Sequence, residues 1–208
     1  MPLFPISLKL RGRLCVVVGG GAIAEAKIQS LLLAEAHVVV IAPEVTEAVA
    51  TWARVGQIEW QARTFAAEDL CGAFLVVAGT SSAQVNHEVF QQCEAEGILC
   101  NVVDDPEYCH FYYPAVLQRG ALQIAISTEG QSPALAQRLR RELEAQFGPE
   151  YESWLQWLGA ARKFLRSEGK DPEETKRLLH KLASEEMFEK FLREGARDER
   201  ELISRSTP

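Results

Sequence analysis

The sequence contains no long hydrophobic run and no signal peptide pattern, which narrows the class of protein. No stretch of the 208 residues approaches the roughly 20 uninterrupted apolar residues that a membrane-spanning helix needs. The N-terminal segment MPLFPISLKLRGR lacks the apolar core and small-residue cleavage site of a secretory signal. We therefore expect a cytoplasmic protein that does not bind membranes.

Cysteine and histidine are also scarce, and neither is arranged to hold a metal. The five cysteines are odd in number, widely spaced and never paired as CxxC, so neither a disulfide framework nor a structural zinc site is indicated. The four histidines show no metal-ligand spacing. We expect buried, reduced thiols and no protein-bound metal.

Basic residues are scarce in the first two thirds of the chain. Residues 1–137 hold 7 Lys and Arg against 14 Asp and Glu, whereas residues 138–208 hold 15 of each class. An acidic first part without a basic stripe argues against nucleic acid as a partner, because duplex binding depends on neutralised phosphates. A small metabolite is the expected partner.

The composition, with 47% hydrophobic and 25% charged residues, is typical of a globular protein. Short apolar runs alternate with helical patterns, which predicts β-α-β units and a Rossmann-like, doubly wound parallel sheet. The expected strands are Leu14–Val18, Val38–Ile41, Phe74–Ala78, Ile98–Val103 and a further one at Leu122–Ile126. The spacing predicts helices after Gly21 and over Ser82–Glu96.

From Ser132 onward the pattern is helical only. Ser132 and Pro133 form a good helix start, since serine is a preferred N-cap and proline suits the first helical position. Gly148 and Pro149 end this helix, and further apolar stripes follow. We expect an α/β domain over residues 1–131 and a small α-helical domain over residues 132–208.

The sequence Gly19-Gly20-Gly21-Ala22-Ile23-Ala24 is a GxGxxA fingerprint between a predicted strand and a predicted helix. In a dinucleotide-binding turn, the first glycine (Gly19) permits the tight turn and the second (Gly21) lets the backbone approach a pyrophosphate. Free N–H groups at the helix start then face the anion. The alternative, a glycine turn that binds nothing, is less consistent with the surrounding strand-helix-strand pattern.

The turn after the second strand favours NAD over NADP. Ala42 occupies the position where an acidic residue often contacts the ribose, but Glu44 follows two residues later. No Arg or Lys between Ile41 and Arg54 can receive a 2′-phosphate. After the third strand, Thr80 is expected to pass beside the nicotinamide half, although a Gly-Thr pair is more often only a turn.

Two adjacent carboxylates, Asp104 and Asp105, follow the strand that ends at Val103. Ligands of open α/β sheets bind beyond the carboxyl ends of the strands, so these residues are candidate bases. Adjacent acids before a proline are commonly only solvated turn formers, and spacing alone does not decide between the two interpretations. His110 is another candidate acid in the following segment.

Several ordered motifs together carry a family resemblance. These are LFPISLKLRGRLCVVVGGG with Ala24 and Lys27 after it, then NVVDDPE, then FxxP at Phe111 to Pro114, and AIST-G-SPALA. The chain resembles the precorrin-2 dehydrogenase family, the N-terminal module of siroheme synthases. The similarity runs from about Pro2 to Phe147, and the helical remainder agrees in length and character.

The resemblance implies NAD-dependent oxidation of precorrin-2 to sirohydrochlorin, followed in some members by ferrous iron insertion to give siroheme. It also implies a homodimer, with dimerisation elements near the end of the first domain, and a helical domain that encloses the substrate. The family's key aspartate corresponds to Asp104, its asparagine to Asn101 and its active-site hydroxyl to Thr128. Its NAD contacts correspond to Ala22, Ile23, Pro43 and Glu44.

Three positions depart from the family pattern. Ala26 replaces the usual arginine before Lys27, Ser81-Ser82 replaces a common acidic pair, and Glu129 interrupts the glycine pair after the hydroxyl residue. Glu129 adds a negative charge where a polyanionic tetrapyrrole is expected. Arg138, Arg140 and Arg141 are one place to find compensating cations, although charged helix faces are usually just solvated.

Two functions from other classes remain as alternatives. One is a Rossmann module that binds NAD(H) as a regulatory signal without turnover. The other is a reductase of a different small molecule that uses His110 as its acid. Asp104 discriminates between the interpretations, since neither alternative needs that carboxylate.

Overall fold

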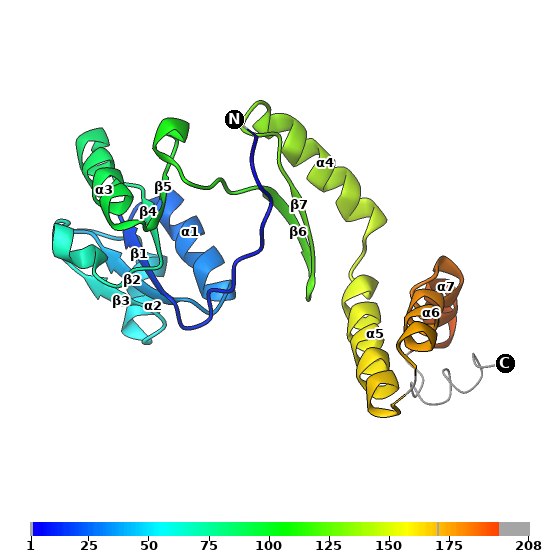
Figure 1. Cartoon of the computed structure of the whole chain (residues 1–208). Coiled ribbons are helices and arrows are strands. Elements are labelled where there is room, and N and C mark those ends of the chain that lie inside the picture. Colours follow the sequence, from blue (N-terminus) through cyan, green and yellow to red (C-terminus); the bar gives the residue numbers. More distant parts are fainter. Residues whose placement is uncertain (1, 170, 196–208) are drawn as a thin grey trace. The chain divides into compact units, whose positions relative to one another are not determined.

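The computed structural model describes residues 2–169 and 171–195 of the chain (Figure 1). Contacts divide the chain into two compact units, Met1–Tyr113 and Pro114–Pro208. The end of the expected helical domain, residues 196–208, lies outside the described residues. The functional boundary between residues 131 and 132 stays a prediction.

The first unit is built on a five-stranded parallel sheet of order β3-β2-β1-β4-β5. The strands are β1 (Leu14–Val18), β2 (His37–Ile41), β3 (Glu59–Gln61), β4 (Leu75–Ala78) and β5 (Leu99–Val102). The helices are α1 (Ala22–Leu33), α2 (Glu47–Arg54) and α3 (Ala83–Glu96), with short 3-10 turns η1 (Ala67–Leu70) and η2 (Pro106–Tyr108). The strand order reverses between β1 and β4, which is where ligands bind in open α/β sheets.

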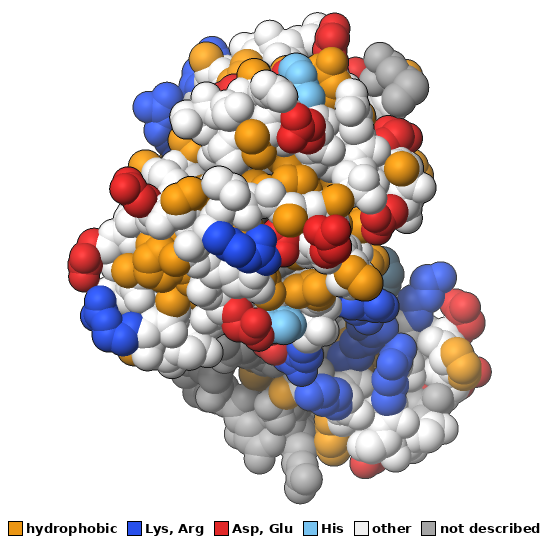
Figure 2. Space-filling model, turned by 90° about the vertical axis from the view of Figure 1, so that its left-hand side faces the viewer, with side chains coloured by type: hydrophobic (Ala, Val, Ile, Leu, Met, Phe, Trp, Pro, Cys, Tyr) orange, Lys and Arg blue, Asp and Glu red, His pale blue; other side chains and the backbone are white. Residues whose placement is uncertain are grey.

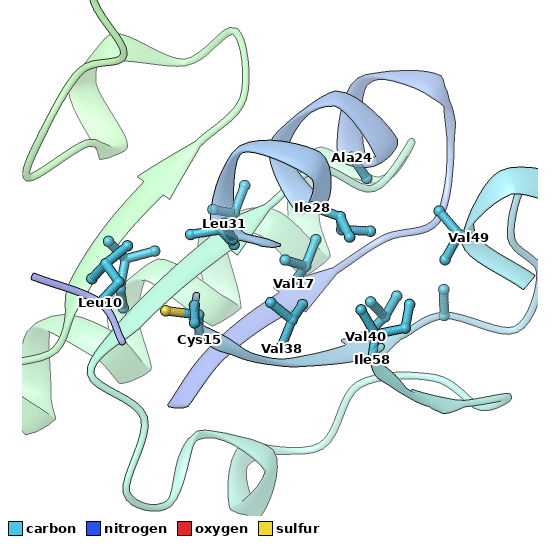
Figure 3. Packing of buried hydrophobic residues seen from close by; sticks show 14 residues of the cluster. Leu10, Cys15, Val17, Ala24, Ile28, Leu31, Val38, Val40, Val49 and Ile58 are labelled. Atoms are coloured by element: carbon cyan, nitrogen blue, oxygen red, sulfur yellow. The ribbon is translucent and has the colours of Figure 1, made fainter. Parts of the chain in front are cut away.

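Both faces of this sheet are buried, which explains the continuous apolar strands. Alternate residues of β1 point to opposite sides, so Val17 joins the core under α1 and Val16 the core under α3. Figure 3 shows Ala24 and Ile28 of α1 lying over Val17. Full burial of a side chain such as Ile28 stabilises the fold by roughly 1.5–3 kcal/mol.

Side chains cap two of the three helices of the first unit. Thr46 accepts from the Val49 N–H at 3.4 Å at the start of α2, and Ser82 accepts from the Val85 N–H at 3.3 Å at the start of α3. At α1 the N-cap is Gly21, which supplies no side-chain hydrogen bond. The first amides of α1 therefore stay available to a ligand.

The second unit consists of a β-hairpin and four helices. The hairpin pairs β6 (Ala115–Arg119) with β7 (Leu122–Ile126), and the helices are α4 (Pro133–Gln146), α5 (Glu150–Ser167), α6 (Pro172–Leu182) and α7 (Glu185–Glu194). Arg119 Nε donates to the Phe147 carbonyl at 2.9 Å, which joins the hairpin to the end of α4. A separate apolar core, centred on Trp154, Trp157 and Phe191, holds α5, α6 and α7 together.

The expected fold class, a Rossmann-like sheet followed by a helical part, is confirmed. The further strand expected at Leu122–Ile126 is confirmed, and it pairs with β6 in the antiparallel hairpin rather than with the parallel sheet. The expectation that the cysteines are buried was wrong in part. Cys71 is exposed, whereas Cys15, Cys93 and Cys100 are buried as expected; all five thiols are free.

Within the described residues, no helix combines the length and apolarity that crossing a membrane requires.

Candidate functional site

The glycine turn after β1 is fixed by close contact with the turn after β4. Gly19 has a φ of +119°, and a Cβ there would lie 2.4 Å from the Gly79 carbonyl oxygen. Its N–H donates to the Ile41 carbonyl at 2.9 Å, at the end of β2. Only glycine meets both demands, since side chains rarely adopt this φ and no space exists for one.

The middle glycine has a structural role that sequence reasoning missed. A Cβ on Gly20 would lie 2.3 Å from the Glu44 carbonyl oxygen and 2.6 Å from a methyl group of Val45. The Gly20 carbonyl accepts from the Thr46 N–H at 3.0 Å. The turns after β1 and β2 therefore pack backbone against backbone. The GxGxxA pattern allows any residue at the position of Gly20, so the pattern alone does not reveal this contact.

Gly21 differs from its two neighbours because it faces open space. Apart from its immediate chain neighbours, the described chain places no atom within 4 Å of a Cβ built on this residue. Ala22 and Ile23 are exposed beside it, Ile23 by 52% despite its apolar side chain. An uncapped helix start with room in front of it fits a pyrophosphate, which accepts from backbone N–H groups and gains from the helix dipole.

Pro43 and Glu44 are exposed on the turn after β2, where an adenosine ribose is expected. The Trp60 indole donates to the Ala42 carbonyl at 2.9 Å and so holds the start of this turn. Arg63 is the first basic residue after β3 in the sequence; it forms an ion pair with Asp69 and lowers the pKa of that carboxyl.

The Thr80 side chain is engaged within its own turn. Its hydroxyl lies 2.7 Å from Asn86 Oδ1 and accepts from the Ser82 N–H at 3.1 Å. The Thr80 backbone N–H also donates to Asn86 Oδ1, and Asn86 Nδ2 donates back to the Thr80 carbonyl. Asn86, a buried polar residue that sequence reasoning missed, thus shapes the turn that packs on Gly19.

The two adjacent carboxylates after β5 have different surroundings. Asp105 Oδ2 lies 2.9 Å from His87 Nε2, and the His87 ring stacks on Tyr108 with centroids 3.9 Å apart. Asp104 is exposed and has a φ of +60°, the left-handed conformation that few residues with side chains adopt. Asp105 is therefore held in a local pair, whereas Asp104 is presented to solvent from a strained backbone.

Asn101 is buried beneath this turn. Its Nδ2 donates to the Phe111 carbonyl at 2.8 Å and to Cys109 Sγ at 3.3 Å. The Cys109 thiol in turn donates to the Val102 and Asp105 carbonyls at 3.1 and 3.2 Å, and burial raises the pKa of this thiol. Asn101 therefore fixes the chain that follows Asp104.

Lys27 on α1 joins this group, although sequence reasoning noted it only as part of a motif. Its ammonium lies 3.7 Å from the centroid of the Tyr113 ring. Burial lowers the pKa of Lys27, and the nearby Asp104 and Cys109 oppose that shift. The Tyr113 hydroxyl is buried without a partner among the described residues, and burial raises the pKa of Tyr113.

Thr128, the expected hydroxyl residue, belongs to the second unit. Its Oγ1 accepts from the Ser132 N–H at 3.2 Å, and its carbonyl accepts from the Gln131 N–H at 2.9 Å. Glu129 and Gly130 follow with φ values of +52° and +79°. The loop before α4 is thus a tight turn that places a threonine hydroxyl next to a helix start.

His110 is engaged on both ring nitrogens. Nδ1 accepts from the Cys100 N–H at 3.0 Å, and Nε2 lies 2.9 Å from Glu94 Oε2. This arrangement anchors the segment after η2 to β5 and α3, and it gives the imidazole a structural role. Among the described residues, no three His, Cys, Asp or Glu side chains are grouped so that they could hold a metal ion.

Comparison with known proteins identifies related chains. Residues 6–115 match a family model described as putative NAD(P)-binding, and residues 119–146 match one described as sirohaem biosynthesis protein central. The siroheme synthase of Photorhabdus laumondii is 41% identical over 145 residues, which cover 70% of this chain and 31% of that protein. Siroheme synthase 3 of Aeromonas hydrophila is 35% identical over 195 residues, covering 94% of this chain and 42% of the relative.

A solved structure named SirC, precorrin-2 dehydrogenase, superposes with a TM-score of 0.83 at 27% identity. The match covers 98% of this chain and 100% of that one. The chain thus spans about a third of the first curated relatives, at 31% of the Photorhabdus protein, but the whole of this solved structure.

The glycine turn yields a prediction that separates packing from ligand approach. Gly20→Ala should lower the thermal unfolding midpoint by several degrees, because its Cβ would meet the Glu44 carbonyl at 2.3 Å. Gly21→Ala should leave the midpoint within about two degrees but weaken NADH binding about tenfold or more. Its Cβ would occupy the open space through which the pyrophosphate approaches the backbone. Thermal unfolding and NADH fluorescence titration of both variants measure the two effects. Equal behaviour of the two variants would contradict this division of roles.

Proposed function

Because the chain belongs to the precorrin-2 dehydrogenase family, the N-terminal module of siroheme synthases, we propose that it oxidises precorrin-2 to sirohydrochlorin with NAD as acceptor. The observation that carries the proposal is one edge of the sheet. There, the uncapped start of α1 follows β1, beside which the strand order reverses, and the exposed Asp104 follows β5, two strands along the same sheet.

The cofactor contacts proposed for this edge are the backbone of Gly21, Ala22 and Ile23 for the pyrophosphate, with Gly19 forming the tight turn beneath it, and Pro43 and Glu44 for the adenosine ribose. Bound NAD supplies the hydride acceptor. Thr80, whose side chain is held by Asn86, contributes the turn that passes beside the nicotinamide half.

Dehydrogenation also releases a proton, and Asp104 is the proposed base for it. An exposed carboxylate at the cofactor edge can accept a proton directly from a bound macrocycle. Asn101 supports this role by fixing the backbone after Asp104 through the Phe111 carbonyl. Thr128 supplies the proposed hydroxyl contact with the substrate.

The substrate is a polyanion and therefore needs cations. Figure 2 shows several Lys and Arg side chains close together toward the lower right of the visible face, and others at its centre and left edge. On α4, Arg138 and Arg140 pair with Glu142 and Glu144 one turn away, and Arg141 Nε donates to the Gln137 carbonyl. Such surface pairs contribute little to stability, so these arginines can exchange partners for substrate carboxylates.

Ferrous iron insertion is proposed as a second step at the same site, with iron as a substrate rather than a resident cofactor. Insertion displaces two pyrrole protons, and the exposed carboxylate of Asp104 can accept them one at a time, passing the first to solvent before it takes the second. The names of the curated relatives, siroheme synthases, favour this step. Anaerobic turnover of precorrin-2 with NAD and ferrous iron, followed by absorbance, tests whether siroheme forms.

We also propose a homodimer formed through the β6–β7 hairpin. A two-stranded hairpin alone is marginally stable, and its outer edges have unpaired backbone groups. Val116 in β6 is 41% exposed although it is apolar. Pairing with a second copy would cover both features.

The expected cytoplasmic location stays a prediction.

The proposed base leads to the first functional prediction. Asp104→Asn should reduce NAD-dependent sirohydrochlorin formation at least a hundredfold, the usual contribution of a positioned base. Anaerobic turnover of precorrin-2, followed by absorbance, measures the effect. Asp105→Asn is the matched control and should retain most activity, because Asp105 is paired with His87. Near wild-type turnover by Asp104→Asn would refute the mechanism, while NADH binding without any turnover by the wild type would favour the regulatory alternative.

Cofactor preference gives the second prediction. Glu44 and Glu47 would face a 2′-phosphate, and a unit charge about 5 Å away costs roughly 3 kcal/mol at an effective dielectric near 20. Because Glu44 is exposed, solvent screening reduces this repulsion between the carboxylate and the 2′-phosphate to about 1–2 kcal/mol. We therefore expect kcat/KM to be about tenfold higher with NAD than with NADP. Glu44→Arg should narrow or invert this ratio. Equal kcat/KM values of the wild type with NAD and NADP would show that Glu44 does not face the ribose.

The dimer proposal predicts that Val116→Asp shifts the protein to a monomer, because it places a charge in the proposed apolar contact. Light scattering after size-exclusion chromatography at micromolar concentration measures the mass. Val55→Asp serves as the matched control, since Val55 is 63% exposed at the end of α2 in the first unit. A monomeric wild type, or loss of the dimer in both variants, would count against the hairpin interface.

A further inference from the structure

The ammonium of Lys27 forms no ion pair with the described residues of the first unit. It lies on α1, partly buried, with its ammonium 3.7 Å from the centroid of the Tyr113 ring. Within the described part of the chain this ring contact is the interaction that holds the ammonium, and no ion pair accompanies it. A ring face contacts one side of an ammonium and leaves its remaining N–H donors for another acceptor.

Most other cations of the first unit are already engaged. Arg11 pairs with Glu35, Arg54 with Glu47 and Arg63 with Asp69. Arg13 packs over the Phe74 ring, with its guanidinium carbon 5.1 Å from the centroid, at the residue that precedes β1. Arg13 therefore lies at the amino edge of the sheet, away from the edge at which β5 delivers Asp104.

The environment of Lys27 favours a bound anion. Burial lowers the pKa of Lys27 because desolvation disfavours the charged form, and Asp104 is close enough to act against this shift. An anion placed on the ammonium would compensate for the lost hydration more strongly than one bound to a fully exposed lysine. The site that contains Asp104 is also where a polyanionic substrate has to approach.

We propose that Lys27 is a substrate-binding residue that receives a side-chain carboxylate of the tetrapyrrole next to Asp104. The inference rests on the proposed function and deepens it, since it assigns one substrate carboxylate to a residue of the first unit. Tyr113 holds the ammonium in place beneath that carboxylate.

Direct binding of sirohydrochlorin, the product, tests the inference without relying on turnover. Lys27→Met keeps the length of the side chain and removes its charge, so the dissociation constant for sirohydrochlorin should rise about tenfold at low ionic strength. Lys27→Arg keeps the charge and the ring contact and should stay within about threefold of the wild type. The wild-type affinity should also fall more steeply with salt than that of Lys27→Met. NADH binding should be unchanged in both variants.

Arg13→Met is the matched control, because it removes a cation stacked on an aromatic ring of the same unit at the opposite edge of the sheet. It should leave sirohydrochlorin affinity unchanged. In steady-state assays with precorrin-2, Lys27→Met should raise KM and keep kcat within about threefold.

Each contrary outcome has a distinct meaning. Unchanged sirohydrochlorin affinity in Lys27→Met, with an active wild type, overturns the inference alone. Unchanged affinity together with a loss of kcat also overturns it and assigns Lys27 to the positioning of Asp104 instead. A wild type that binds NADH but neither binds sirohydrochlorin nor oxidises precorrin-2 overturns the inference and the proposed function together.

Discussion

The close backbone contact among three turns at the carboxyl edge of the sheet is the constraint on which the rest of the site depends. Gly19 lies against the Gly79 carbonyl, and Gly20 lies against the Glu44 carbonyl, so the turns after β1, β2 and β4 form one packed layer. Because Cβ atoms are absent at the contacts, α1 starts directly above this layer with its first amides uncapped. The same packing sets the positions of the Glu44 and Thr80 turns, which flank the dinucleotide site that we propose. A single extra methyl group in this layer therefore acts on fold and cofactor site together.

The second half of the site depends on how the chain leaves β5. Asp104 adopts a left-handed backbone conformation that costs of order 1 kcal/mol or more, and such strain persists only where the surroundings fix it. Here the Val103 N–H continues the ladder to the Ala78 carbonyl at 2.8 Å, and Asn101 holds the Phe111 carbonyl on the other side. The turn is thus fixed at both ends, and one carboxylate is left exposed between them. The strain is consistent with a side chain whose position matters for chemistry.

Much of this arrangement could be predicted from the sequence, and the limits have physical causes. Strong β-branched runs and the glycine fingerprint gave the sheet, its helices and the edge at which ligands bind. The short strand Glu59–Gln61 and the hairpin strand Ala115–Arg119 escaped prediction, because three residues or mixed polarity give no clear period. The contrast between Asp104 and Asp105 could not be read from two adjacent letters, because it depends on His87, eighteen residues earlier on α3. Gly20 and Asn86 are likewise defined by long-range contacts that local patterns do not contain.

The charge distribution bears on how the chain would hold the polyanionic substrate that we propose. Residues 1–137 carry twice as many acidic as basic residues, 14 against 7, and three arginines of the first unit are paired with carboxylates. This excess of negative charge disfavours a polyanion near Asp104, and Lys27 is one nearby cation that opposes it. The second unit holds a balanced but dense set of charges, with two arginines on α4 that pair with glutamates one turn away. Ion pairs of this kind contribute little to stability, so the α4 arginines and the partly buried Lys27 are the candidate cations for the polyanionic substrate that we propose.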